Sequence, residues 1–159
     1  MRETPESLAR RLEQEGEKTI SYLQQFPSAH LDVQVYEDGA AWTVRQVFMH
    51  LVEAEGSIPR LIADVLEGGE GVPEDFDLDR YNESRVRKMG SLSKEEIIKR
   101  FSDLRNDNVK MVSGIDEKDL QVTGRHPFWE ETTVEEMLRA MYMNVKVHVR
   151  DIKRVLQES

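Results

Sequence analysis

The sequence contains no cysteine, and this absence removes several kinds of chemistry at once. Disulfides, thiolate nucleophiles and sulfur-only metal sites are excluded, so any metal ion has to be held by histidine, carboxylate, amide or water. Long hydrophobic runs are also missing, because charged residues interrupt the apolar stretches, and no segment is predicted to span a membrane. The first residues, 1–5, lead into polar sequence without the apolar core of a signal peptide, so we expect a cytoplasmic protein.

Positive charge is scarce relative to negative charge. The chain has 22 Lys and Arg against 31 Asp and Glu, for a formal net charge of −9. Because DNA binding depends on neutralising phosphates with a basic surface, we expect no nucleic acid partner. The 159 residues suit one domain, 1–159, that is large enough to bury a single core.

Four long segments carry apolar residues at helical spacing and begin with residues that cap helices. They are residues 5–26, 44–66, 93–115 and 133–156. A fifth, shorter helix is indicated from Leu78 to a stop at Gly90, and Pro59 is expected to kink the second long helix. Residues 67–73 are predicted to be a mobile loop and residues 116–132 a long loop. The fold class is therefore all-α, a four-helix bundle with a short extra helix between helices 2 and 3.

The most informative segment is Trp42–Leu51, at the start of the second long helix. Thr43 can cap the helix, and Gln46 stands where a capping-box side chain reaches back. His50 follows about two turns later, on the flank of the apolar face. A second histidine, His148, shares the apolar face of the last helix. Two histidines placed in this way are candidates for a site inside the bundle, although histidines on helices are more often structural.

Three segments in this order resemble the DinB-like superfamily of four-helix bundles, which includes the YfiT-type proteins and the N-terminal domain of mycothiol-dependent maleylpyruvate isomerase. The first is Trp42–Gln46 leading to His50 and Leu51. The second is Asp79–Glu83 through Gly90–Ser93, and the third is Thr133–Glu136 running to His148–Ile152. Together these segments span most of the chain.

The resemblance implies a divalent metal site built by one histidine of helix 2 and two histidines of helix 4, spaced by four residues. His50 matches the helix 2 ligand, and His148 matches the second helix 4 ligand. Asn144 stands at the remaining position, where an amide oxygen is a weaker ligand for zinc or nickel than an imidazole. The expected metal set is therefore His50, His148 and Asn144. We also expect the two histidines to approach each other, with or without metal.

The resemblance implies an activity on a small-molecule substrate or a low-molecular-weight thiol, by thiol-transferase or isomerase-like chemistry. The alternative from another class is a metal-free helical binding or stress-related protein that has lost the three-histidine tripod. A homodimer is among the assemblies that we consider. The two hypotheses separate on whether purified protein carries a divalent metal ion.

Several other polar residues leave a functional and a structural interpretation open. Glu53 and Asp151 each follow a candidate histidine by one helical turn, and we favour solvated acids over metal ligands or partners of the histidines. Asn108 interrupts an apolar stripe and is expected to bond to a neighbouring backbone rather than point into the cleft. His30 and His126 fall in predicted loops, where we expect exposed side chains.

Overall fold

The computed structural model of the chain describes residues 2–157. The described residues form five α-helices, a two-stranded sheet and two short 3-10 helices, at Ser28–His30 and Glu117–Gln121. The longer elements are α1 (Pro5–Gln25), α2 (Val44–Leu66), α3 (Leu78–Met89), α4 (Lys94–Ser113), β1 (Thr123–His126), β2 (Glu130–Thr133) and α5 (Val134–Val155). None of the described helices is long and apolar enough to cross a membrane.

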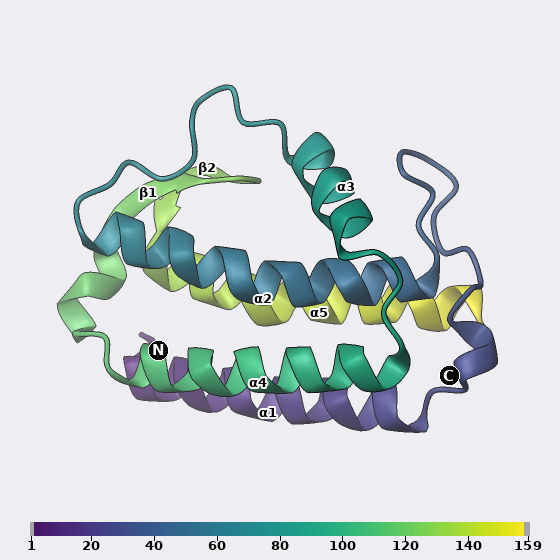
Figure 1. The fold of residues 1–159 in the computed structure, drawn as a ribbon. Coiled ribbons are helices and arrows are strands. Elements are labelled where there is room, and N and C mark those ends of the chain that lie inside the picture. Colours follow the sequence, from purple (N-terminus) through teal and green to yellow (C-terminus); the bar gives the residue numbers. More distant parts are fainter. Residues whose placement is uncertain (1, 158–159) are drawn as a thin grey trace.

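The four long helices form a closed ring in which each one contacts two others. Helices α1 and α4 pack together, α2 and α5 pack together, and contacts between α1 and α5 and between α2 and α4 join the two pairs. Helix α3 and the hairpin lie over α2, on the side away from α1 and α4 (Figure 1). This confirms the predicted all-α four-helix bundle with a short helix between its second and third long helices.

Side-chain caps set where the helices begin, as the sequence indicated. Three of the long helices start with a capping box, in which two side chains each accept from the other residue's backbone N–H. These pairs are Thr4–Ser7, Thr43–Gln46 and Ser93–Glu96. The box at Thr43 fixes the first turn of α2 and therefore the angular position of every residue after it.

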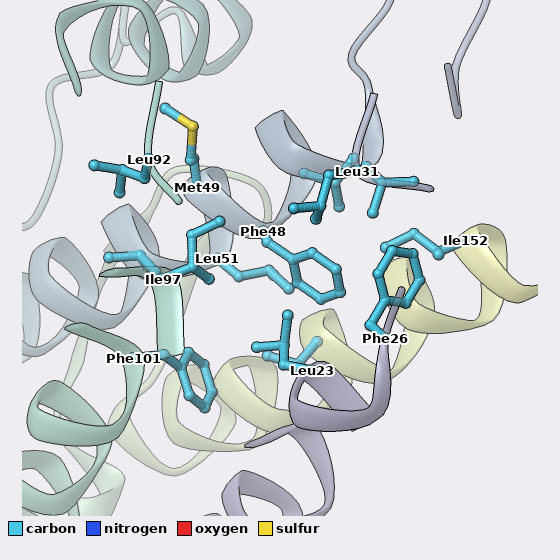
Figure 2. Close-up of a cluster of buried hydrophobic side chains, with 14 of the residues drawn as sticks. Leu23, Phe26, Leu31, Phe48, Met49, Leu51, Leu92, Ile97, Phe101 and Ile152 are labelled. Carbon is cyan, nitrogen blue, oxygen red and sulfur yellow. The ribbon is translucent and has the colours of Figure 1, made fainter. Parts of the chain in front are cut away.

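The apolar core is divided into two clusters along the bundle. The first joins the C-terminal part of α1 to the first half of α2 and the start of α4. Figure 2 shows the rings of Phe26 and Phe48 beside each other and Phe101 apart from them, among aliphatic side chains. The second joins the start of α1 to the end of α2 and the start of α5, around Leu12, Ile62 and Met137.

A buried polar layer lies between the two clusters. Arg105 donates through Nε and Nη2 to the Glu55 carboxylate at 2.8 and 2.6 Å, and each residue is 2% exposed. Arg105 Nη1 also donates to the carbonyl of Leu12 at 2.8 Å, which ties α1 to α4 and α2. The guanidinium lies where Gly16 leaves room, since a Cβ there would stand 2.8 Å from the Arg105 side chain.

Asn108 completes this layer. Its Nδ2 donates to the backbone carbonyl of Glu55 at 2.8 Å and to the Glu55 carboxylate at 3.0 Å. That carbonyl is the one that Pro59, which has no N–H, cannot bond within the helix. The expectation that Asn108 bonds to a neighbouring backbone is confirmed, and α2 continues through Pro59 without a break.

One of the two predicted loops, residues 116–132, contains regular structure, and the other remains a loop that is bonded to it. Residues 123–133 form an antiparallel hairpin in which Thr123 pairs with Thr133 and His126 with Glu130. The glycine-rich segment after α2 is attached to this hairpin: Arg125 N donates to the Glu70 carbonyl at 2.8 Å, and Val72 N donates to the Arg125 carbonyl at 3.0 Å. Gly71 is required there, because its φ is +96° and a Cβ would lie 2.4 Å from the Arg125 backbone.

Candidate functional site

A cleft of about 920 Å³ opens between α2 and α5, beneath α3 and the tip of the hairpin. Its floor comes from α2 and α5, one end from the segment that precedes α2, and the opposite end from residues 126–129 of the hairpin. Five aromatic side chains line it, namely Tyr36, Trp42, Tyr81, Phe128 and Trp129. Among the described lining residues none is Lys or Arg, so the cleft offers no cation to an anionic ligand.

His50 and His148 meet in this cleft. The centroids of their rings are 5.2 Å apart with nearly perpendicular planes, which confirms the expected approach of the two side chains. His50 comes from the second turn of α2 and is 8% exposed, and the centroid of the Trp42 ring is 5.1 Å from the centroid of its own ring. The capping box at Thr43 therefore determines which way His50 faces.

A hydrogen-bonded chain orients His148. The hydroxyl of Tyr36 donates to Asp151 Oδ2 at 2.8 Å and lies 2.9 Å from His148 Nδ1. Because the phenol has one proton and the carboxylate can only accept, His148 Nδ1 carries a hydrogen and donates it to the Tyr36 oxygen. The Nε2 lone pair of His148 is thereby left available to a ligand. The interpretation of Asp151 as a solvated acid is wrong, because it holds Tyr36 and, through it, His148.

Burial keeps both rings neutral. Burial, with a smaller contribution from the neighbouring His148, lowers the pKa of His50 to about 3. Burial also lowers the pKa of His148, against the opposing effect of the Asp151 charge. At neutral pH both side chains are therefore bases or ligands rather than cations. The Nδ1 atom of His50 is buried without a hydrogen-bond partner in the described part of the chain.

Asn144 precedes His148 by one helical turn and lines the same cleft. Spacing of four residues stacks their side chains on one face of α5. Within residues 2–157, no three side chains of His, Cys, Asp or Glu are grouped so that they could hold a metal ion. The cleft thus brings together the three residues that the sequence singled out, as two imidazoles and one amide.

Glu53 has a structural role that the sequence interpretation missed. It is 9% exposed, accepts from the Tyr81 hydroxyl at 2.8 Å and pairs with Arg85 at 3.3 Å. Both partners belong to α3, whose one buried residue among those described is Val86. The favoured reading of Glu53 as a solvated acid is wrong: it fastens α3 over the cleft.

His126 also differs from the exposed loop residue that we expected. It is 8% exposed on β1, stacks on Trp129 with ring centroids 5.1 Å apart, and accepts from the Phe128 backbone N–H through Nδ1. Burial lowers its pKa to about 4. His30 is half-buried and packs edge-on against Phe26. The sequence signal for His126 was faint, because four-residue strands around a short turn carry little periodicity.

The mouth of the cleft combines acidic and apolar side chains. Asp38, Asp79 and Glu83 are exposed carboxylates in its lining. Four of the five large hydrophobic residues exposed in the described part of the chain also line it, namely Phe128, Trp129, Met143 and Val147. An acidic, apolar rim around neutral histidines favours uncharged or cationic organic molecules over anions.

Comparison with known proteins supports the fold along the whole chain. An uncharacterised protein from Escherichia coli UTI89 aligns with a TM-score of 0.72 at 19% identity, over 100% of this chain and 98% of the other. An uncharacterised protein from Clostridium difficile 630 gives a TM-score of 0.73 at 14% identity, over 99% and 98%. YfiT from Bacillus subtilis, described as a probable metal-dependent hydrolase with an unusual four-helix bundle topology, gives 0.73 at 18% identity, over 98% and 89%.

No curated protein matches the chain by sequence. A family model does match, and it extends over residues 6–152. This range contains all four long helices of the bundle except Pro5 and the last residues of α5, together with the cleft and both of its facing histidines. The chain is a member of the DinB superfamily.

Proposed function

We propose that the cleft between α2 and α5 binds a small, largely apolar organic molecule whose polar group contacts His50 and His148. The observation that carries this proposal is the pair of neutral, closely placed histidines in an aromatic cleft of about 920 Å³. Clefts of this size and lining are typical of small-molecule sites. The acidic rim and the lack of lining cations favour a neutral or cationic molecule.

The family resemblance implies a divalent metal, and the residues present fit one of modest affinity. His50 and His148 would supply two neutral imidazoles, and Asn144 would supply an amide oxygen. The Tyr36–Asp151 chain supports this assignment, because histidine ligands usually donate their second nitrogen to a fixed acceptor. A bound divalent ion such as zinc or nickel supplies Lewis acidity or activates a water or a thiol.

Residues around the two histidines fix the tautomer of His148 and the surroundings of His50. Tyr36 and Asp151 hold the His148 ring in one tautomer, so its Nε2 is the atom offered to a proton, a substrate or a metal. Trp42 packs against the His50 ring and would limit the access of water to it. Hydrolysis, the reaction named for B. subtilis YfiT, and the transfer of a small thiol both use a nucleophile that is deprotonated at such a position.

A metal-free binding protein is the second candidate. It is favoured by Asn144, since catalytic zinc sites ordinarily use three strong protein ligands and no group of three is found in the described residues. In that case the same histidines would serve as hydrogen-bonding groups for the bound molecule.

Calorimetric titration with zinc and nickel separates the two candidates. We compare wild type, Asn144→His and His50→Ala, each prepared without a histidine tag. The metal-centred proposal expects weak binding by wild type, binding at least about tenfold tighter by Asn144→His, and none by His50→Ala. If Asn144→His binds no better than wild type, the cleft is not a metal tripod and the metal-free candidate replaces it.

A further inference from the structure

A second hollow, of about 620 Å³, lies between α1 and α5. We call it the basic groove, because five cationic side chains line it: Lys18, Lys146, Arg150, Lys153 and Arg154. The hydrophobic part of its lining consists of Tyr22, Val145 and Val149. Four of the cations belong to α5, at spacings that place them along one face over about two turns.

In the described part of the chain, the cations of the basic groove outnumber the carboxylates that pair with them. Glu15 pairs with Lys18 at 3.3 Å and with Lys146 at 3.6 Å. Asp151 is shared in the same way by the two arginines, at 3.4 Å from Arg150 and 3.9 Å from Arg154. The fifth cation, Lys153, lies over the Tyr22 ring at 5.1 Å. Among the described residues, two carboxylates pair with four of the five cations, which leaves a local excess of positive charge on a chain whose net charge is −9.

An ordinary solvated helix face looks different in this same protein. On the outer side of α4, Lys99 pairs with Asp103 at 2.8 Å, and Arg100 is balanced by Glu96. Each of these two cations has its own acid one turn away. In the basic groove the acids are shared, and the unneutralised charge is gathered in a concave site with an apolar floor.

We propose that the basic groove binds a small soluble molecule carrying two or more phosphate groups. The positive side chains from Lys146 to Arg154 extend over roughly 12 Å of α5 at 1.5 Å per residue, which suits several anionic groups in a row better than one. Arginine forks such as those of Arg150 and Arg154 pair with phosphate oxygens bidentately. The groove is distinct from the cleft of the proposed function, since no lysine or arginine lines that cleft in the described chain.

Asp151 connects the two hollows. Its Oδ1 faces Arg150 and Arg154 in the groove, while its Oδ2 accepts the Tyr36 hydroxyl that bonds to His148. A phosphate that pairs with the two arginines takes them from Asp151. The Asp151 carboxylate therefore competes with the ligand for the two arginines, and removing its charge strengthens binding in the groove.

The test is calorimetric titration of the full chain with inorganic tripolyphosphate, at low and at physiological ionic strength. Wild type is expected to bind at one saturable site, less tightly at higher salt. The double variant Lys146→Gln/Arg150→Gln should lose about tenfold or more in affinity. Asp151→Asn should bind more tightly than wild type. Lys110→Gln, an exposed lysine on α4, is the matched control and should behave as wild type.

A parallel arm separates soluble phosphates from lipid headgroups. Vesicles of phosphatidylglycerol and of phosphatidylcholine are mixed with the protein and sedimented. The proposal is overturned if wild type shows no saturable tripolyphosphate binding, if the double variant binds as wild type does, or if only the anionic vesicles bind. Because all substituted side chains except Asp151 are exposed or at the surface of the groove, thermal melts should confirm that the variants remain folded.

Discussion

The cleft and the basic groove share helix α5 but have opposite electrostatic character. The cleft holds neutral histidines, aromatic rings and an acidic rim, without a lysine or arginine in its described lining. The groove holds five cations and an apolar floor. Helical periodicity explains how one element serves both: Asn144 and His148 repeat with a spacing of four, and so do Lys146 and Arg150, displaced by two residues. A displacement of two residues is a rotation of roughly 200° around the helix.

The difference shows that the net charge of the chain does not describe the local charge of each hollow. The formal charge is −9, yet five cationic side chains gather at the seam between α1 and α5. The following predictions test the residues around the two hollows, and the last one tests whether the hollows act together.

The largest effect is expected at the ion pair on which both hollows depend. Glu55 lines the cleft and holds Arg105, which in turn binds the Leu12 carbonyl of α1, the other wall of the groove. Glu55→Ala leaves a buried guanidinium unpaired and should lower the free energy of unfolding by about 3–5 kcal/mol. Urea denaturation followed by circular dichroism measures this.

The control for that prediction is the double variant Glu55→Met/Arg105→Met. Replacing both charges by apolar side chains of similar length should cost far less than the single change, because no buried charge is left unpaired. Equal destabilisation by the single and the double variant would show that the layer is held by packing rather than by the ion pair.

Acid should lower the free energy of unfolding through the three histidines that line the cleft. The folded pKa of His50, about 3, lies below the unfolded value near 6.5, so between these pH values the unfolded chain binds a proton that the folded chain does not. The free energy of unfolding should fall as pH falls below about 6.5, by up to about 1.4 kcal/mol per pH unit for this residue. The pKa values of His126 and His148 are lowered too and act in the same direction.

Urea unfolding between pH 7.5 and pH 5 measures this slope, a range chosen to span the unfolded pKa of histidine. His50→Leu should reduce the slope, whereas Lys18→Ala in the basic groove should leave it unchanged. A slope that is the same in wild type and His50→Leu would mean that His50 titrates alike in the folded and unfolded chain.

The helices were predictable from sequence because their signals are local. Thr43 and Gln46 cap α2 within one turn, and the apolar stripe that follows fixes the side on which His50 lies. The partner of His148 was not predictable, since Tyr36 is 112 positions away and only the folded bundle brings the two together.

Burial of charge was equally invisible in the sequence. Glu55 and Arg105 meet across two helices, and nothing in the local sequence marks them as a pair. The hairpin was missed because its four-residue strands lack alternation and depend on pairing with Glu70 and Val72. In each case the missing information was a contact between distant segments.

A smaller effect on stability is expected from removing the Tyr36 hydroxyl. This change tests whether Asp151, through Tyr36, orients His148 in the cleft. Tyr36→Phe removes the bridge between Asp151 and His148 and should cost about 0.5–1.5 kcal/mol of stability, the usual net contribution of a hydrogen bond, because these groups are only partly buried. Zinc affinity should fall by roughly 10–100-fold, as for other groups that orient a metal-binding histidine. Calorimetry and thermal unfolding measure the two quantities.

Tyr81→Phe is the matched control, because Tyr81 is also a cleft tyrosine that donates to a buried carboxylate, that of Glu53. It should lose comparable stability and keep the zinc affinity of wild type. If the two variants affect zinc equally, Tyr36 stabilises the fold and does not position His148.

The smallest effect on stability, and the sharpest test of the cleft's rim, is expected from Phe128→Ser. Phe128 is 71% exposed, so its removal should change the free energy of unfolding by no more than about 0.5 kcal/mol. Nile red, an uncharged apolar dye, serves as a probe that the cleft should accept and the basic groove should not. Binding should weaken several-fold, since apolar area that Phe128 offers to a ligand contributes roughly 25 cal/mol per Å² buried.

Val155→Ser provides the comparison, because Val155 is the one large hydrophobic residue among those exposed in the described chain that does not line the cleft. Its stability should change as little as that of Phe128→Ser, while the fluorescence titration with Nile red should match wild type. Added tripolyphosphate should leave dye binding by all three proteins unchanged if the hollows are independent. A shift in dye affinity with tripolyphosphate, lost in Asp151→Asn, would show instead that the carboxylate shared by the arginines and Tyr36 transmits occupancy of the groove to the cleft.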